Sequence, residues 1–407
     1  MGGAKPGQAA DMEPHLTPPS ACTEPTEVGS LPNAALDRLA SMMAAGSSVV
    51  GIGESTRFSH ETFTVRSRLL QRLAEHHGFR ALALQDDAIV AAELDAYVTG
   101  DHGTAVAALA DAWRPWRTAE MVATLEWIRR FNQRHPGESF RIFGVKPTRA
   151  RPADYDAVLE RVRTLAPERL AEMSSYLEPI RTAHDIDEHV QRARGSHPGR
   201  TFAERARDAL ATIRALPGVD ADDPVVARMR LIVDYHERSV AGRGSYAGDA
   251  EEWADTIEDY QRRTDRRVVF WDGIAHTAAA AVTLGLAVEH GPQPTVGSVL
   301  RRRYREQYVS VAIGFHHGDL GVVVPEPAVD LVDSVLGEVD LPAHWLDLRT
   351  AESRRRWGGP AKLRVISGVY DPSRDAVEHM AVTSLSEAFD LLIHIREASA
   401  VQRLADQ

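Results

Sequence analysis

One segment constrains the fold of this chain more than any other: residues 47–66, SSVVGIGESTRFSHETFTVR. Its apolar run ends at Gly51 and Gly53, and the carboxylate of Glu54 follows at once. Glycines at the end of a β-branched run favour a sharp backbone turn where a buried strand stops. In a parallel sheet such a strand end delivers side chains to the carboxyl edge, where open α/β sheets bind ligands. The segment therefore predicts a strand that carries Glu54 to a ligand-binding edge.

The residues after Glu54 predict an amphipathic helix over 59–77. Four of them follow one another at spacings of three, four and three and share one face: Phe63, Arg66, Leu70 and Leu73. Arg66 therefore points inward, where a guanidinium needs a carboxylate or an anionic ligand, and Glu54 is the nearest candidate in sequence. Two interpretations stay open: a structural pair that ties helix to sheet, or part of a functional site.

Strand and helix patterns alternate from residue 30 to about 150, with helices expected also at 88–98 and 118–133. Short apolar strands are expected at 47–52, 80–84, 140–144, 266–271, 309–314, 320–324, 363–366 and 391–395. Residues 152–262 lack strand signals. We therefore expect an α/β fold, a mostly parallel central sheet flanked by helices with an inserted helical subdomain. Its predicted parts are a disordered segment 1–29, a first core part 30–151, the helical subdomain 152–262 and a second core part 263–407.

Composition narrows the class of protein. An apolar fraction of 43% suffices for a large core, and a net charge of −11 argues against nucleic acid as a partner. No apolar run of about 18 residues occurs, so no membrane span is expected. The single cysteine, Cys22, excludes an intrachain disulfide, and the N-terminal stretch lacks the apolar region of a secretory signal. We expect a cytoplasmic protein.

Two cofactor motifs are incomplete in this segment. Thr56 stands where a dinucleotide fingerprint needs its third glycine. His60 and Glu61 begin an HExxH pattern, but Thr64 replaces its second histidine. We therefore expect neither a cofactor nor a metal.

The stretch GIGESTRFSHETFTVR resembles the erythromycin esterase family, whose pattern is close to G-[IL]-G-E-x-T-H-x-x-x-E-F-[FL]-x-x-[RK]. The matching positions are Gly51, Gly53, Glu54, Thr56, Glu61, Phe63 and Arg66. Further similar blocks follow in the family's order, among them HHGFRALALQDDAIVAAELDAYVTG, VVFWDGIAH and VGSVLRRRYREQYVSVAIGF. The resemblance spans residues 30–400 and implies the family's fold.

The chain departs from the family pattern at positions that carry its chemistry. The motif histidine, which in the family is thought to act as a general base on water, is Arg57 here. Gln85 replaces a glutamate, Lys146 an aspartate and Gly273 a histidine, whereas His276 is retained. These changes add about three to four positive charges relative to the family pattern, because arginine and lysine stay protonated. They favour a small anionic substrate over the family's cationic macrolides.

Three hypotheses for the function remain open. The first is an erythromycin esterase-like hydrolase of an ester or lactone, with Glu54 and His276 handling protons and Arg57 and Arg66 stabilising the oxyanion. In it, Gln85, Lys146 and Asp272 bind substrate. His60 could stand in for the lost base, or it could be a helix-terminus histidine with local hydrogen bonds. The second hypothesis is a tailoring lyase, cyclase or isomerase of secondary metabolism, and the third is a non-catalytic protein that binds a small anion.

Overall fold

The computed structural model describes residues 31–239, 246–366, 368 and 370–405. The predicted disordered segment 1–29, which includes Cys22, lies outside the described residues.

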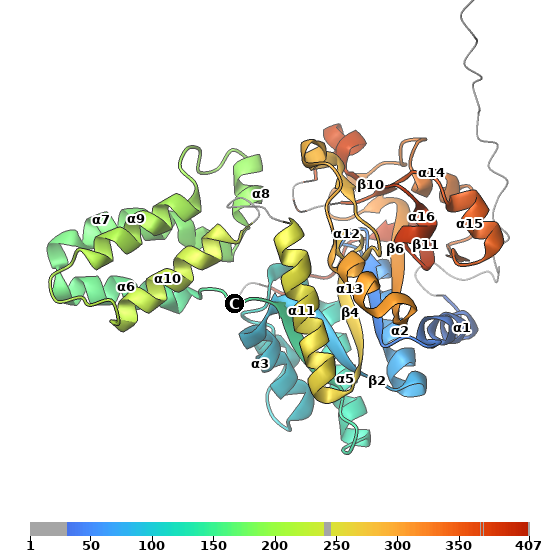
Figure 1. The fold of residues 1–407 in the computed structure, drawn as a ribbon, viewed down its shortest axis with the longest axis horizontal. Coiled ribbons are helices and arrows are strands. Elements are labelled where there is room, and N and C mark those ends of the chain that lie inside the picture. Colours follow the sequence, from blue (N-terminus) through green and yellow to red (C-terminus); the bar gives the residue numbers. More distant parts are fainter. Residues whose placement is uncertain (1–30, 240–245, 367, 369, 406–407) are drawn as a thin grey trace, which may run out of the picture.

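A central sheet forms the framework of the molecule (Figure 1). Its strands are β1 (Val49–Glu54), β2 (Phe79–Asp87), β3 (Arg141–Lys146), β4 (Arg267–Gly273), β6 (Tyr308–Asp319), β7 (Val323–Val324), β8 (Ala343–Asp347) and β11 (Leu391–Ser399). The strand order is β3-β2-β4-β1-β6-β11-β8, and β7 pairs with β6. All neighbours along this path are parallel except β8, which runs antiparallel to β11, and β7 is antiparallel to β6. The predicted mostly parallel sheet is confirmed.

Strand predictions in the last third of the chain were less accurate. The strand expected at 320–324 is shorter in the structure. It is the two-residue strand β7, which pairs with the last residues of β6. The strand expected at 363–366 is β9 (Ala361–Arg364), and it lies in a separate three-stranded sheet with β5 (Thr283–Leu284) and β10 (His379–Val382). Strand β8 was missed altogether.

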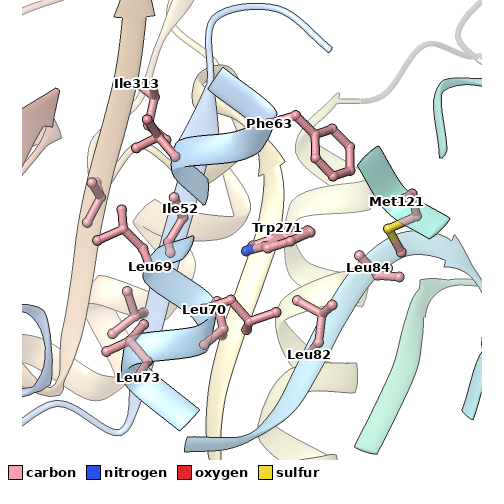
Figure 2. Packing of buried hydrophobic residues seen from close by; sticks show 14 of the residues in the cluster. Ile52, Phe63, Leu69, Leu70, Leu73, Leu82, Leu84, Met121, Trp271 and Ile313 are labelled. Atoms are coloured by element: carbon pink, nitrogen blue, oxygen red, sulfur yellow. The ribbon is translucent and has the colours of Figure 1, made fainter. Parts of the chain in front are cut away.

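Alternate residues of each strand face opposite layers of the core. Val50 and Ile52 of β1 point to the layer that holds α1 (Asn33–Ala44), α2 (His60–His77), α3 (Ala88–Thr99) and α5 (Ala119–Arg134). Figure 2 shows Leu69, Leu70 and Leu73 of α2 packed over Ile52 in this layer. Val49 points to the other layer, formed by α11 (Tyr246–Thr264) and α13 (Val296–Tyr304). The central strands are thus covered on both faces, as a parallel sheet requires.

The remaining helices of the sheet domain are short. They are α4 (Ala105–Ala108), α12 (Ile274–Thr277), α14 (Val332–Gly337), α15 (Ala351–Trp357) and α16 (Leu385–Ala388). Helix α12 follows directly on β4 and packs against the end of β1.

A group of helices projects away from the sheet on the left of Figure 1. It consists of α6 (Pro152–Leu165), α7 (Leu170–Arg181), α8 (Glu188–Ala193), α9 (Phe202–Arg214) and α10 (Pro224–Glu237). Helices α6, α7, α9 and α10 share an apolar cluster of their own, which runs from Ala150 to Val233. Helix α11, which the sequence analysis placed with this group, instead packs against β3, β4 and α13.

The two glycines of β1 do not form the sharp turn that we predicted. Both lie within the strand, which continues in register with β4 through Glu54. Their role is close packing, because a Cβ at Gly53 would lie 2.7 Å from the Cα of Ile274 in α12. Contacts this short do not occur in folded proteins, so only glycine lets α12 lie against the strand end.

Candidate active site

The predicted pair between Glu54 and Arg66 exists and is enclosed by protein. Ser59 caps the start of α2 by accepting from the Thr62 backbone, and the helix then carries Arg66 under β1. Arg66 donates to Glu54 Oε2, and both side chains are 1% exposed. Burial lowers the pKa of Arg66 to about 9, so it remains a cation at neutral pH. Arg66 is buried and already paired with Glu54, so we assign it the role of holding Glu54 in place.

Arg57 lies where the carboxyl ends of strands β1, β2 and β4 meet. Its Nη2 donates to Gln85 Oε1 of β2 and to Asp272 Oδ1 of β4, and its Nε lies 3.5 Å from Glu54 Oε1 of β1. Three strands therefore fix one guanidinium, which remains 21% exposed. The register explains the meeting: Gly53 pairs with Asp272, so Glu54 and Asp272 end adjacent strands one residue apart.

A tryptophan links Arg57 to Lys146. The Trp113 backbone donates to Asp86 at 2.7 Å, which fixes the loop that carries the ring. Arg57 Cζ lies 4.5 Å and Lys146 Nζ 4.7 Å from the centre of that ring. Lys146 ends β3, is partly exposed, and has no hydrogen bond or ion pair within the described residues. Burial lowers its pKa, against the opposing charges of Asp187, Asp86 and Asp272.

His276 joins the same cluster from α12. Its imidazole stacks on Trp253 of α11 with ring centres 5.1 Å apart, and Lys146 Nζ lies 5.7 Å from that indole. Burial lowers the pKa of His276 to about 4; Asp272 opposes the shift, and Arg57 and Lys146 add to it. The imidazole is therefore neutral at pH 7, the form that the neighbouring cations Arg57 and Lys146 favour.

Gly273 leaves the space that Arg57 uses. A Cβ at position 273 would lie 3.7 Å from Arg57 Nη2. A large side chain at this position would compete with the guanidinium for the volume beside Asp272. Positions 57 and 273 are therefore spatially coupled.

Two arginines at the strand ends lie beside carboxylates, and one of them, Arg57, belongs to the predicted gain in positive charge. Arg66 is matched by Glu54, and Arg57 by Asp272. Among the described residues, these two carboxylates each keep one buried oxygen, Glu54 Oε1 and Asp272 Oδ2, without a hydrogen-bond donor. Among the described cations of the cluster, Lys146 is the one whose charge has no direct carboxylate contact. We call Glu54, Arg57, Gln85, Lys146, Asp272 and His276 the strand-end cluster.

His60 lies elsewhere in the described structure. Its Nδ1 is 2.7 Å from Glu120 Oε1, and Glu120 also accepts from the Gln402 backbone at 3.1 Å. The neighbouring Glu61 accepts from the Ser399 backbone at 2.6 Å. Both residues thus fix the end of β11 and the segment after it against the start of α2, and within the described residues His60 makes no hydrogen bond or ion pair with the strand-end cluster.

Comparison with known protein families identifies the family of this chain. The family model described as erythromycin esterase matches residues 74–398. This chain belongs to the erythromycin esterase family. The resemblance seen in the sequence is thereby confirmed, and the match spans β2 to β11, including Gln85, Lys146, Asp272 and His276.

Solved structures with the same fold cover nearly the whole chain. A Bacillus cereus protein is 18% identical over 94% of this chain and 96% of its own, with a TM-score of 0.63. A succinoglycan biosynthesis protein is 20% identical over 93% and 95%, with a TM-score of 0.61. A histidine-to-asparagine mutant of the erythromycin esterase EreC in its open conformation is 18% identical over 94% and 97%, with a TM-score of 0.54. At these identities the likeness establishes the erythromycin esterase fold.

Some residues around the erythromycin esterase-like cluster were not assigned a role from the sequence. Trp113 and Trp253 contact it from a loop and from helix α11, and Asp249 lies four residues before Trp253 on that helix. In the described part of the chain, no group of three or more His, Cys, Asp and Glu side chains is arranged to hold a metal ion. None of the described helices combines the length and apolar character needed to cross a membrane.

Proposed function

We propose that this chain hydrolyses an ester or lactone of a small anionic molecule that is not a macrolide. The observation that carries the proposal is the fixed position of Arg57 at the strand ends. Its Nη2 is held by Gln85 and Asp272, whereas Nη1 has no hydrogen-bond partner in the described structure. A donor fixed before the substrate arrives stabilises a developing oxyanion without having to reorganise.

The other members of the cluster supply complementary roles. His276 is neutral at pH 7, so its imidazole can form a hydrogen bond with the substrate without adding charge to the site. Lys146 offers an ammonium group without a hydrogen-bonded partner, which suits a carboxylate or phosphate of the substrate. Arg66 holds Glu54, and Glu54 Oε1 lies 3.5 Å from Arg57 Nε, so this pair helps to position Arg57. Trp113 and Trp253 provide aromatic surface beside these groups.

Hydrolysis of p-nitrophenyl hemisuccinate by the purified protein tests this function. Arg57→Gln removes the oxyanion donor and is expected to lower kcat about 10²- to 10³-fold. The matched control is Arg355→Gln, because Arg355 is an exposed arginine of α15 and lies outside the cluster. Erythromycin should stay intact in the same preparation, as judged by mass spectrometry. Cleavage of the hemisuccinate ester at the buffer rate would contradict the proposal.

The tailoring alternative is favoured by one specific observation. In the sequence pattern, Arg57 stands where the family motif has a histidine, and a guanidinium that stays protonated cannot activate water as a base. A lyase, cyclase or isomerase would use Arg57 and His276 without water. Reaction in ¹⁸O-labelled water separates the two functions, because hydrolysis places labelled oxygen in a product and rearrangement does not. A non-catalytic anion-binding protein would show binding of succinate and no turnover of any ester.

A further inference from the structure

Helix α11 presents a second functional group to the strand-end cluster. Asp249 and Trp253 are four residues apart and therefore share one face of the helix. Trp253 is the residue whose indole stacks on His276 and lies near Lys146. Asp249 therefore lies on the helix face that Trp253 turns toward the cluster, and the charges of Lys146 and Asp272 influence its carboxyl group.

Asp249 differs from the other carboxylates of its helix. Glu252 is paired with Arg238 at 2.9 Å, and Asp255 with Arg303 at 2.7 Å. Asp249 is partly exposed, and its side chain has no hydrogen bond or ion pair within the described residues. A carboxylate left unpaired beside a charged cluster is available to a substrate or to water.

We propose that Asp249 is the catalytic proton-transfer residue of this site, an inference that rests on the hydrolase function proposed above. Its carboxylate takes a proton from water as the water oxygen bonds to the acyl carbon. The carbonyl electron pair moves onto the carbonyl oxygen, which Arg57 stabilises. When the carbonyl re-forms and the acyl carbon–oxygen bond breaks, Asp249 returns the proton to the departing alkoxide. The products are an alcohol and a carboxylic acid, which releases its own proton to solvent.

The environment of Asp249 suits this role better than that of the other carboxylates. Glu54 and Asp272 are buried and hold arginines, so neither is free to exchange protons with a substrate. Burial raises the pKa of Asp249 to about 6. The charges around it partly cancel: Lys146 and Arg238 lower the pKa, and Glu252 and Asp272 raise it. A general base is most effective when its pKa lies near the operating pH.

The test compares the pH dependence of kcat/KM for p-nitrophenyl hemisuccinate in three variants. Wild-type kcat/KM should fall as the pH drops below about 6, because the base becomes protonated. Asp249→Asn should lower kcat/KM about 10²- to 10⁴-fold at pH 8 and abolish this acid limb. Asp249→Glu should restore part of the rate together with the limb. The control is Asp255→Asn, the same change at an exposed position of the same helix.

A second measurement is independent of turnover. Carbon-13 spectra of aspartate-labelled protein, with the Asp249→Asn spectrum subtracted, give the titration of this one carboxyl group. It should titrate near pH 6 and shift when succinate is added.

The outcomes separate this inference from the proposed function. If wild type cleaves the ester and Asp249→Asn keeps both the rate and the acid limb, the role of Asp249 is overturned and the hydrolase function stands. If no ester is cleaved, the hydrolase function is wrong, and the carbon-13 spectra then test whether Asp249 belongs to the site. A carboxyl group that titrates near pH 4 and ignores succinate overturns its place in the site.

Discussion

The buried pair between Arg66 and Glu54 makes the sharpest prediction about stability. Arg66→Ala would leave the buried Glu54 carboxylate at the end of β1 with Arg57 as its remaining ion-pair partner among the described residues, its Nε 3.5 Å away. Removing one partner of a buried ion pair typically costs about 3–5 kcal/mol, because the remaining charge is desolvated without compensation. The guanidinium carbon also lies 4.4 Å from the ring centre of Trp271 and 5.3 Å from that of Trp116, and these contacts would be lost as well.

Urea unfolding followed by tryptophan fluorescence measures this effect, since two tryptophans border the guanidinium. Arg66→Met preserves most of the side-chain volume and so separates the loss of charge from the formation of a cavity. The double change Arg66→Met with Glu54→Gln should recover much of the stability, because no unpaired charge remains. A double-mutant cycle then isolates the coupling between the two residues.

The control is Arg163→Ala, which removes an exposed pair with Glu160 on helix α6. Exposed pairs contribute about 0–1 kcal/mol, so this variant should unfold almost like wild type. If Arg66→Ala cost no more than Arg163→Ala, the buried pair would not hold helix α2 to the sheet, and the reasoning from burial would be refuted.

Three further outcomes follow from the cluster. Succinate should raise the thermal midpoint of wild type but not of Lys146→Met, with a gain of about 2.7 kcal/mol at a concentration 100-fold above Kd; equal shifts in both would indicate a general salt effect. Gly273→His should displace Arg57 and lower ester cleavage about 10²-fold, whereas Gly273→Ala, whose Cβ would meet Arg57 at 3.7 Å, should keep its activity. His276 has a folded pKa of about 4, below its usual 6.5, so it favours unfolding as the pH falls from 6.5 to 4. His276→Asn should therefore weaken the dependence of the thermal midpoint on pH in that window, and an unchanged dependence would contradict the assigned burial.

Local periodicity was sufficient to predict the parts of the site that one helix and one strand determine. The spacing of apolar residues in α2 placed Arg66 inward, and Glu54 proved to be its partner. The rule that parallel strands end at one edge also placed Gln85, Lys146 and His276 correctly at or near strand ends.

Contacts between neighbouring strands could not be predicted from the sequence and became known only from the structure. That Asp272 neutralises Arg57 depends on the register between β1 and β4, which no local pattern encodes. The predicted gain in positive charge therefore left out the carboxylate that lies beside Arg57. The positions of Trp113 and Asp249 depend on a loop fixed by Asp86 and on how α11 crosses β3. Strand β8 was missed because it is short and pairs antiparallel at the edge of the sheet.

We propose that this erythromycin esterase-like site cleaves anionic esters and recognises their negative charge through Lys146. The most direct measurement is the ratio of kcat/KM for p-nitrophenyl hemisuccinate to that for p-nitrophenyl butyrate, a neutral ester of similar length. A hydrogen bond to a charged group contributes about 1.5–3 kcal/mol, so wild type should prefer the hemisuccinate about 10- to 150-fold. Lys146→Met should bring the ratio close to one. A wild-type ratio of one or less, or a preference that survives in Lys146→Met, would contradict the account.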